Sequence, residues 1–457
     1  MITGLATFLG TLDASIVNVS LPTISRELGT TVDIVGWVAL AYAIAVVSFL
    51  MVFGAVSEKK GYRITYLYGF ALFITASVMC GLSFHIYFLV IWRAIQGMGA
   101  ALLISVGPAL ITRSFPPGER GRGLSMIAMV VSAGLMLGPP LGGFIIAAGG
   151  WRWIFFVNVP FGLLCIYFTE KFIRNFPISN PDKKIALPGA ISLSIALLSL
   201  MLSLSFYSSQ ILGLHYLAGL LLVSAIFFGL FLYFESDPDT RLIGLGIFKS
   251  RVFTFSGLAM FLVFISLSAV TILMPFYLEQ IKNLNPEDVG LILMVIPVCG
   301  FIMAPVAGYM ADRLQARLIS TLGVIIMLIG TIFVGRLGID STIYHVIFAL
   351  LMIGIGMGIF ATPNTSSIMG AAKKHQLGAA AGILATIRSL GMTFGIGLAI
   401  AILNFYQNML LKADGSKPDA FIKGYHSVYK FIIIVMIMAI LFSYVRGKNL
   451  SFGTNET

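Results

Sequence analysis

The chain has 457 residues, of which 58% are hydrophobic and only 10% are charged, and its net charge is +11. So few ionisable side chains cannot cover the surface of a water-soluble protein of this size, because soluble domains carry about 25% charged residues. The composition therefore excludes a set of soluble domains. Apolar runs of about 20 residues recur along the whole chain and predict a polytopic, all-α membrane protein.

Fourteen apolar segments are predicted to cross the membrane as helices. Turn residues and short charged clusters separate them. The first segment has no basic region before it and no small-residue cleavage site after it, so we expect it to be a retained spanning helix. The predicted segments are 2–25, 34–56, 62–84, 86–112, 122–149, 152–173, 185–207, 211–234, 252–279, 288–311, 316–336, 342–367, 377–409 and 427–446.

The basic residues indicate orientation and exclude a nucleic-acid partner. They lie in short clusters between apolar segments and form no basic face. Most of them fall on one side of the membrane if both termini are cytoplasmic, which is the orientation that the positive-inside rule favours. Three cysteines lie within apolar runs without CxxC spacing, and five histidines are not spaced as ligands. We therefore expect no disulfide, no metal site and no cofactor.

Two similar stretches indicate an internal duplication. Residues 54–63 and 308–317 each begin with glycine, have an acid four residues later and end on arginine. The first follows the second segment and the other follows the tenth, so two extra helices must separate two six-helix halves. This predicts a 6+2+6 arrangement of the kind that secondary transporters build from repeats. The expected units are the first half at 1–175, the inserted pair at 176–250 and the second half at 251–457.

The charges in these two stretches predict a cytoplasmic gate. Charges at helix ends can bond across the two halves in one state and part in the other. The alternative is that they only anchor the topology. The candidate gate residues are Gly54, Glu58, Gly61, Arg63, Asp312, Arg313 and Arg317.

Two charges inside predicted spans are the main candidates for function, because burying a charge in a membrane is costly. Asp13 lies roughly 16 Å from the end of the first segment, and Arg93 lies about 10 Å into the fourth. A carboxylate that gains and loses a proton beside a permanent arginine cation is a workable coupling element. A permanent structural ion pair is the alternative. If Asp13 and Arg93 do not meet, Asn18 or Gln96 is instead the immediate hydrogen-bond partner of either charge.

Three further features within the spans are candidates. The fifth segment packs glycines and two prolines together, which favours close helix contact and a kink. Arg388 is a second intramembrane cation, expected to snorkel, to bond carbonyls or to meet an anionic substrate. Glu279 is predicted to be a rim residue, with a role as an accessory acid as the alternative. The glycine-rich residues are Gly134, Gly138, Pro139, Gly142 and Gly143.

Several of these stretches resemble motifs of one family. Residues 134–143 match the pattern G-x-x-x-G-P-x-x-G-G at every specified position, and residues 12–22 resemble the first-helix signature L-D-x-T-x-V-N-x-A-L-P. Residues 54–63 resemble the loop motif G-x-x-x-D-x-x-G-x-[RK], with Glu58 in place of Asp. The run at 151–160 is also typical. The chain is thus similar to the fourteen-helix drug:proton antiporters of the major facilitator superfamily.

The resemblance implies a proton-coupled transporter that exports lipophilic compounds, including cationic ones, by alternating access. The implied partners are the substrate, protons and the lipid of the cell membrane, and the implied state is a monomer. An exporter of lipids or of an endogenous metabolite on the same fold is the alternative. A membrane enzyme is disfavoured because no convergent cluster of catalytic side chains is present. An ATP-driven pump is excluded by the lack of a G-x-x-x-x-G-K-[ST] loop.

Overall fold

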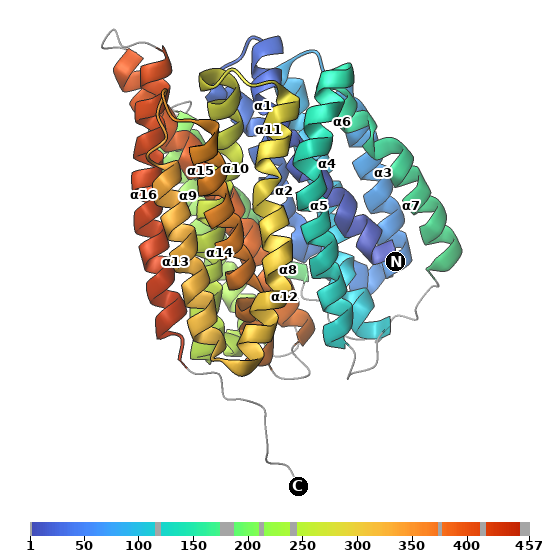
Figure 1. Cartoon of the computed structure of the whole chain (residues 1–457). Helices are drawn as coiled ribbons and strands as arrows, with labels where there is room; N and C mark the ends of the chain where they lie inside the picture. The colour runs from blue at the N-terminus through green and yellow to red at the C-terminus, as the bar shows by residue number, and fades with distance from the viewer. Residues whose placement is uncertain are drawn as a thin grey trace.

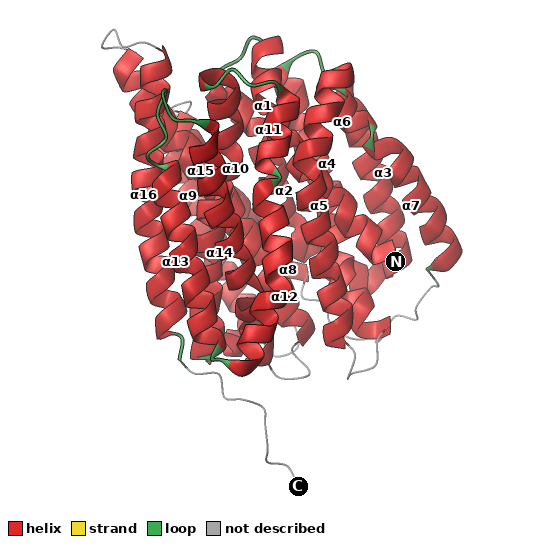
Figure 2. Ribbon diagram, in the orientation of Figure 1, coloured by secondary structure: helices red, strands yellow, loops and turns green. Residues whose placement is uncertain are grey.

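The computed structural model describes an all-helical molecule, and every regular element of its described residues is a helix (Figure 2). Twelve of the described helices are long and apolar enough to cross a membrane. The two other predicted segments correspond to shorter apolar stretches inside helices of 30 and 23 residues. The prediction of an all-α membrane protein is therefore confirmed. The described residues are 2–114, 120–173, 187–209, 214–237, 245–372, 377–411 and 417–447.

The first six predicted segments form seven helices. The sixth segment is divided at Val157, and Pro160 lies in the first turn of the helix that follows, where its missing N–H leaves no helical bond unmade. The helices are α1 (Ile2–Glu27), α2 (Val32–Lys60), α3 (Tyr62–Gly81), α4 (Ile86–Ser114), α5 (Arg120–Gly149), α6 (Trp153–Phe156) and α7 (Asn158–Phe172).

The remaining segments form the inserted pair and the second half. The predicted ninth span continues into a π-helix, η2, and the tenth is divided into two helices at Met294. The elements are α8 (Leu187–Ser209), α9 (Leu214–Ser236), η1 (Leu245–Lys249), α10 (Arg251–Phe276), η2 (Tyr277–Ile281), α11 (Pro286–Leu293), α12 (Val295–Arg313), α13 (Ala316–Val334), α14 (Ile343–Gly370), α15 (Leu377–Leu411) and α16 (Lys417–Val445).

The same helix pairings occur in both halves. In the first half α1 packs on α5, and both α2 and α3 pack on α4. In the second half α10 packs on α15, and both α12 and α13 pack on α14. If the second half repeats the first, α10 corresponds to α1, and these helix pairs occupy equivalent positions in the two halves. The division at residues 175 and 250 stays a prediction, because 174–186 and 238–244 lie outside the described residues.

The two halves meet mainly along two helix pairs, with smaller contacts of α1 to α10 and α11. In Figure 1 the helices α3 to α7 lie on the right and α13 to α16 on the left. Contacts between the halves run from α5 to α11 and from α2 to α15. The inserted helix α8 packs against both α2 and α15, and α9 packs on α8. The inserted pair therefore covers one of the two lines along which the halves meet.

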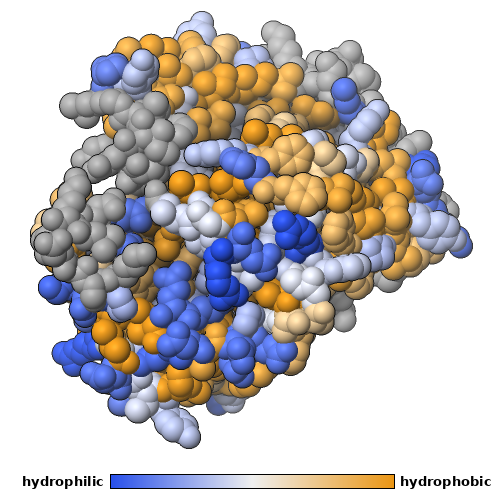
Figure 3. All heavy atoms as spheres, turned by 90° about the horizontal axis from the view of Figure 1, so that it is seen from above, coloured by the Kyte–Doolittle hydropathy of each residue, from blue (hydrophilic) through white to orange (hydrophobic). Residues whose placement is uncertain are grey.

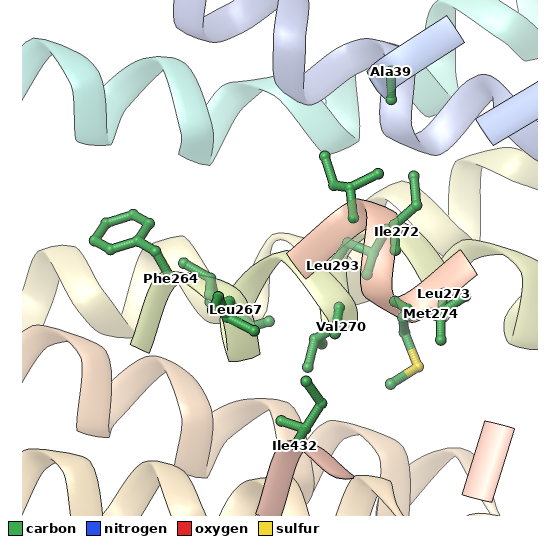
Figure 4. Packing of buried hydrophobic residues seen from close by; sticks show 14 of the residues in the cluster. Ala39, Phe264, Leu267, Val270, Ile272, Leu273, Met274, Leu293 and Ile432 are labelled. Atoms are coloured by element: carbon green, nitrogen blue, oxygen red, sulfur yellow. The ribbon is translucent and has the colours of Figure 1, made fainter. Parts of the chain in front are cut away.

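Apolar side chains fill the interior and much of the outer surface. Figure 4 shows side chains of α10 between neighbours from both halves, with Ala39 of α2 on one side and Ile432 of α16 on the other. Helix α9 exposes large apolar side chains such as Leu222 and Tyr233, which suits contact with lipid. From above, hydrophilic residues gather in the middle and lower part of the face, and hydrophobic residues lie along its upper and right margins (Figure 3).

Candidate functional site

Asp13 and Arg93, predicted from the sequence as a pair, form a buried ion pair. Helix α1 carries Asp13 and helix α4 carries Arg93, and the distance from Arg93 Nη1 to Asp13 Oδ2 is 2.6 Å. Each side chain is only 1% exposed. The pair is thus shielded from water on both sides of the membrane in this conformation.

Two amide side chains complete the shell of Asp13. Gln96 Nε2 donates to Asp13 Oδ1 at 3.0 Å, and Asn158 Nδ2 donates to the same oxygen at 2.7 Å. Both amides also reach Ser77 Oγ, at 2.6 Å from Gln96 and 3.4 Å from Asn158. Asp13 therefore accepts bonds from one cation and two neutral donors, an arrangement that suits an ionised carboxylate.

Arg93 keeps several partners besides the carboxylate. Its Nε donates to the carbonyl of Val38 at 3.0 Å, and its Nη1 donates to Gln96 Oε1 at 2.6 Å. The guanidinium carbon lies 4.2 Å from the ring centroid of Tyr42 and 5.8 Å from that of Phe155. Arg93 would remain held when Asp13 is neutralised, so the charge of the site can change without loss of the arginine's position.

The sequence left open whether Asn18 or Gln96 bonds to Asp13 or Arg93, and the structure distinguishes the two candidates. Gln96 bonds both charges. Asn18 is half-buried and contributes to none of the described side-chain hydrogen bonds. Five residues beyond Asp13, it lies about 140° around the helix and cannot face the same neighbours. The alternative in which Asn18 is the hydrogen-bond partner of Asp13 or Arg93 does not hold in this conformation, and a place for Asn18 in the substrate cavity stays a prediction.

Three members of the cluster were not picked out from the sequence. Asn158, Ser77 and Tyr42 come from α7, α3 and α2, and each is buried. The available signal was Asn158, a polar amide between apolar residues in the 151–160 run. Its partner is 145 residues away in the chain, so only the packing of α7 beside α1 brings the two together.

The glycine-rich stretch of α5 lies against the helix that carries Asp13. An added Cβ at Gly138 would collide with the side chain of Ser15, whose hydroxyl donates to the carbonyl of Leu135 at 3.3 Å. Gly134 and Gly142 approach α1 one turn before and after. Without side chains at these positions, α5 and α1 reach backbone contact.

The same stretch also contacts the second half. An added Cβ at Gly143 would collide with the carbonyl of Pro286, at the start of α11. In turn, an added Cβ at Gly290 of α11 would collide with the carbonyl of Pro139. Helix α5 is therefore packed between the acid-bearing helix and the opposite half of the molecule. A movement between the two halves would therefore act on α1 directly, through α5.

The predicted gate residues lie at the α2–α3 and α12–α13 connections. Gly61 has a φ of +92°, which favours glycine, and Gly54 lies one turn before the acid. The side chains of Glu58 and Asp312 lie outside the described residues. The ion pairs Asp13–Arg93 and Glu27–Arg152 involve no predicted gate residue, so the gate pairing stays a prediction.

Two of the three gate arginines lie over aromatic rings. Arg313 lies over the ring of Tyr309 at 4.4 Å, and Arg317 over that of Tyr444 at 4.9 Å. Arg63 is half-buried, and its Nε has no hydrogen-bond partner among the described residues. Each cation–π contact is worth about 1 kcal/mol at an exposed site, so a movement of the helix ends can break it.

A second buried arginine, Arg446, was expected only as a cytoplasmic topology residue. It is fully buried just beyond α16 and donates to Asn364 Oδ1 at 2.7 Å and to the hydroxyls of Ser256 and Ser320 at 3.2 Å. Burial, and to a lesser degree the nearby Arg317, lowers the pKa of Arg446 to about 10. The hydroxyls and the amide on neighbouring helices allow this cation to be buried.

The structure does not bring Arg388 or Glu279 to the Asp13 cluster. Arg388 is half-buried on α15, with its guanidinium 5.6 Å from the ring centroid of Phe264. Glu279 is buried in η2 and accepts a bond from Thr23 of α1. No group of three or more metal-ligating side chains occurs within the part of the chain that the structure describes.

Comparisons with known proteins agree with this architecture. The model of the Major Facilitator Superfamily matches residues 3–396 and 256–450. The riboflavin transporter RibZ of Clostridioides difficile is 30% identical over 449 residues, which cover 97% of each chain. The multidrug transporter protein MdtP of Bacillus subtilis is 26% identical over 420 residues, covering 90% of this chain and 76% of the relative.

Solved structures show the same fold. The D-xylose-proton symporter superposes with a TM-score of 0.69 at 15% identity, covering 99% of this chain and 98% of the symporter. A bacterial homolog of the human lysosomal transporter Spinster, in an inward-facing and unoccupied conformation, has a TM-score of 0.68 at 14% identity, covering 97% and 95% of the two chains. At these identities the likeness concerns the fold alone. Together with the family match, it shows that this multi-pass membrane protein belongs to the Major Facilitator Superfamily of transporters.

Proposed function

We propose that this transporter exports lipophilic compounds, including cationic ones, across the cell membrane in exchange for protons, with Asp13 as the proton carrier. The observation that carries the proposal is the fully buried Asp13–Arg93 pair. A buried ion pair adds little stability over apolar packing, so its presence in a membrane needs a functional reason. Multidrug relatives such as MdtP support the substrate class.

The cycle follows from the shell around Asp13. Neutralising the carboxylate removes its attraction for Arg93, while the bonds of Arg93 to Val38 and Gln96 keep the arginine in place. Helix α1 is then released from α4, and α5 moves with it because the two helices are in backbone contact. Since α5 also contacts α11, this local change reaches the interface between the halves. Export requires that the two conformations bind proton and substrate with different affinities.

The test is transport of a lipophilic cation into inverted vesicles under an imposed pH gradient. Asp13→Asn is expected to abolish gradient-driven accumulation while substrate exchange without a gradient continues. Glu170→Gln, which changes an exposed acid of the same half, is the matched control and is expected to behave as wild type. Gradient-driven accumulation by Asp13→Asn would contradict the proposal.

A second substrate class is favoured by one observation. RibZ, whose name gives riboflavin as its substrate, is similar over 97% of both chains, whereas the alignment with MdtP covers 76% of that relative. We therefore propose a metabolite of the size and aromatic character of riboflavin as the alternative cargo. Measuring the accumulation of riboflavin and of a lipophilic cation in the same vesicles distinguishes the two, because only the compound that belongs to the transported class is expected to accumulate.

A further inference from the structure

Glu279 is a buried acid at the place where the two halves meet. It lies in the π-helix η2, an irregular element that often marks functional sites, and its side chain is 9% exposed. Thr23 of α1 donates to Glu279 Oε2 at the long distance of 3.5 Å. The other carboxyl oxygen, Oε1, is buried and has no hydrogen-bond partner among the described residues.

A cavity of about 360 Å³ lies beside this carboxyl group. One wall consists of the end of α1 and the turn after it, where Ser25 Oγ donates to the carbonyl of Thr30 at 2.6 Å. The other wall consists of Glu279 and Gln280. The cavity therefore lies on the seam between the halves, which we define as the contact of α1 with η2 and α11 at the upper end in Figure 1.

Within the described part of the chain Glu279 has no ion pair, although Arg26 is near enough to interact with its charge. Arg26 of α1 lines the same cavity and is exposed, but it forms neither of the ion pairs found among the described residues. Glu27 bonds Trp151 and Arg152, and Lys282 donates to the carbonyl of Ile339. On α11, Glu287 and Asp288 are exposed to solvent.

An ionised carboxylate is poorly accommodated in this closed seam. A carboxylate has about four acceptor positions, and here only one is used, by one weak bond. Burying a charged group without such partners is costly, whereas the neutral acid avoids the charge. When the seam opens, water replaces the missing partners and the ionised form becomes favourable.

We propose that Glu279 is a second proton-binding residue, which carries a proton while the seam is closed and releases it when the seam opens. The inference rests on the alternating access of the proposed function but does not depend on Asp13. Closing the seam then takes up a proton, so acid favours the closed seam and alkali favours the open one. By linkage, the ratio of open to closed seam changes by up to about tenfold for each pH unit.

The experiment measures seam opening directly, in the full-length protein in lipid nanodiscs. Thr31 and Asn285 lie on opposite sides of the seam, are exposed and make no side-chain cap bonds, so cysteines there can carry spin labels. Cys299, the native cysteine that is only half-buried, is replaced by serine. All samples also carry Asp13→Asn, so that Asp13 cannot titrate, and the distance distribution is recorded from about pH 5 to 9.

In this background the open population is expected to rise with pH, and Glu279→Gln is expected to keep the seam closed at every pH. Thr23→Val, which removes a bond that exists only in the closed seam, is expected to move the transition to lower pH. The matched control Glu287→Gln is expected to leave the transition unchanged.

The proposal is overturned if the parent shows no pH dependence or if Glu279→Gln retains it. Transport that survives Asp13→Asn would instead refute the proposed function and leave this measurement unaffected.

Discussion

Each half of the molecule buries an arginine within a polar cluster, but the two clusters differ in charge. In the first half Arg93 faces the carboxylate of Asp13, with Gln96 and Asn158 bonded to the same acid. In the second half the partners of Arg446 among the described residues are an amide and two hydroxyls. A proton can change the net charge of the first cluster, whereas the described partners in the second include no acid. The candidate coupling site thus lies in one half of the molecule.

The largest expected effect comes from removing the cation of the first cluster. Arg93→Leu leaves a buried carboxylate without its counter-ion, and we expect loss of transport and a fall in stability of about 3–5 kcal/mol. Thermal unfolding in detergent and vesicle transport measure the two effects. The double variant with Asp13→Asn is expected to regain much of the stability and none of the gradient-driven transport. Equal stability of the single and double variants would show that the pair is not coupled.

Removing the cation of the second cluster is expected to have a smaller effect. Arg446→Met removes the donor to Asn364 Oδ1 and to two hydroxyls but leaves no buried charge, which predicts a loss of about 1–3 kcal/mol. The variant is expected to fold, and the pH dependence of its transport is expected to match that of wild type. A changed pH profile would mean that the second cluster takes part in proton coupling, which would remove the contrast between the halves.

The close packing on the acid-bearing helix predicts a third effect. Gly138→Ala places a methyl group against Ser15, and overpacking of this kind costs about 1–3 kcal/mol. We expect transport to fall several-fold because α5 and α1 can no longer stay in contact. Gly382→Ala on α15, the corresponding helix of the second half, meets nothing within 4 Å and is the matched control. Equal transport by the two variants would argue against a special role of this contact.

The smallest effects separate two asparagines. Asn158→Ala removes one of the two amide donors to Asp13, which predicts a loss of about 1–2 kcal/mol and a moderate fall in transport. Asn18→Ala removes a side chain outside the cluster and is expected to stay within about 0.5 kcal/mol of wild type. Unfolding midpoints and initial transport rates of the two variants test this order. A larger effect of Asn18→Ala would indicate that Asn18 takes part in the site in another conformation of the transporter.

The sequence alone was enough to predict the helices and the two central charges. Runs of about 20 apolar residues are a local signal, and the cost of a charge in a membrane makes Asp13 and Arg93 conspicuous. Glycine spacing likewise marked α5 as a close-packing helix. These properties depend on residues near one another in the chain, and the fold that they predicted is confirmed.

Only the tertiary structure decided which side chains meet. Asn158 and Asp13 are 145 residues apart, and Thr23 and Glu279 are 256 apart, so helix packing rather than local pattern brings each pair together. Arg446 resembled a topology charge because the sequence does not show that helices of the same half supply hydroxyls around it. Hydropathy gives the depth of a residue in the membrane, whereas the partner of a polar group depends on how the helices rotate and pack against one another.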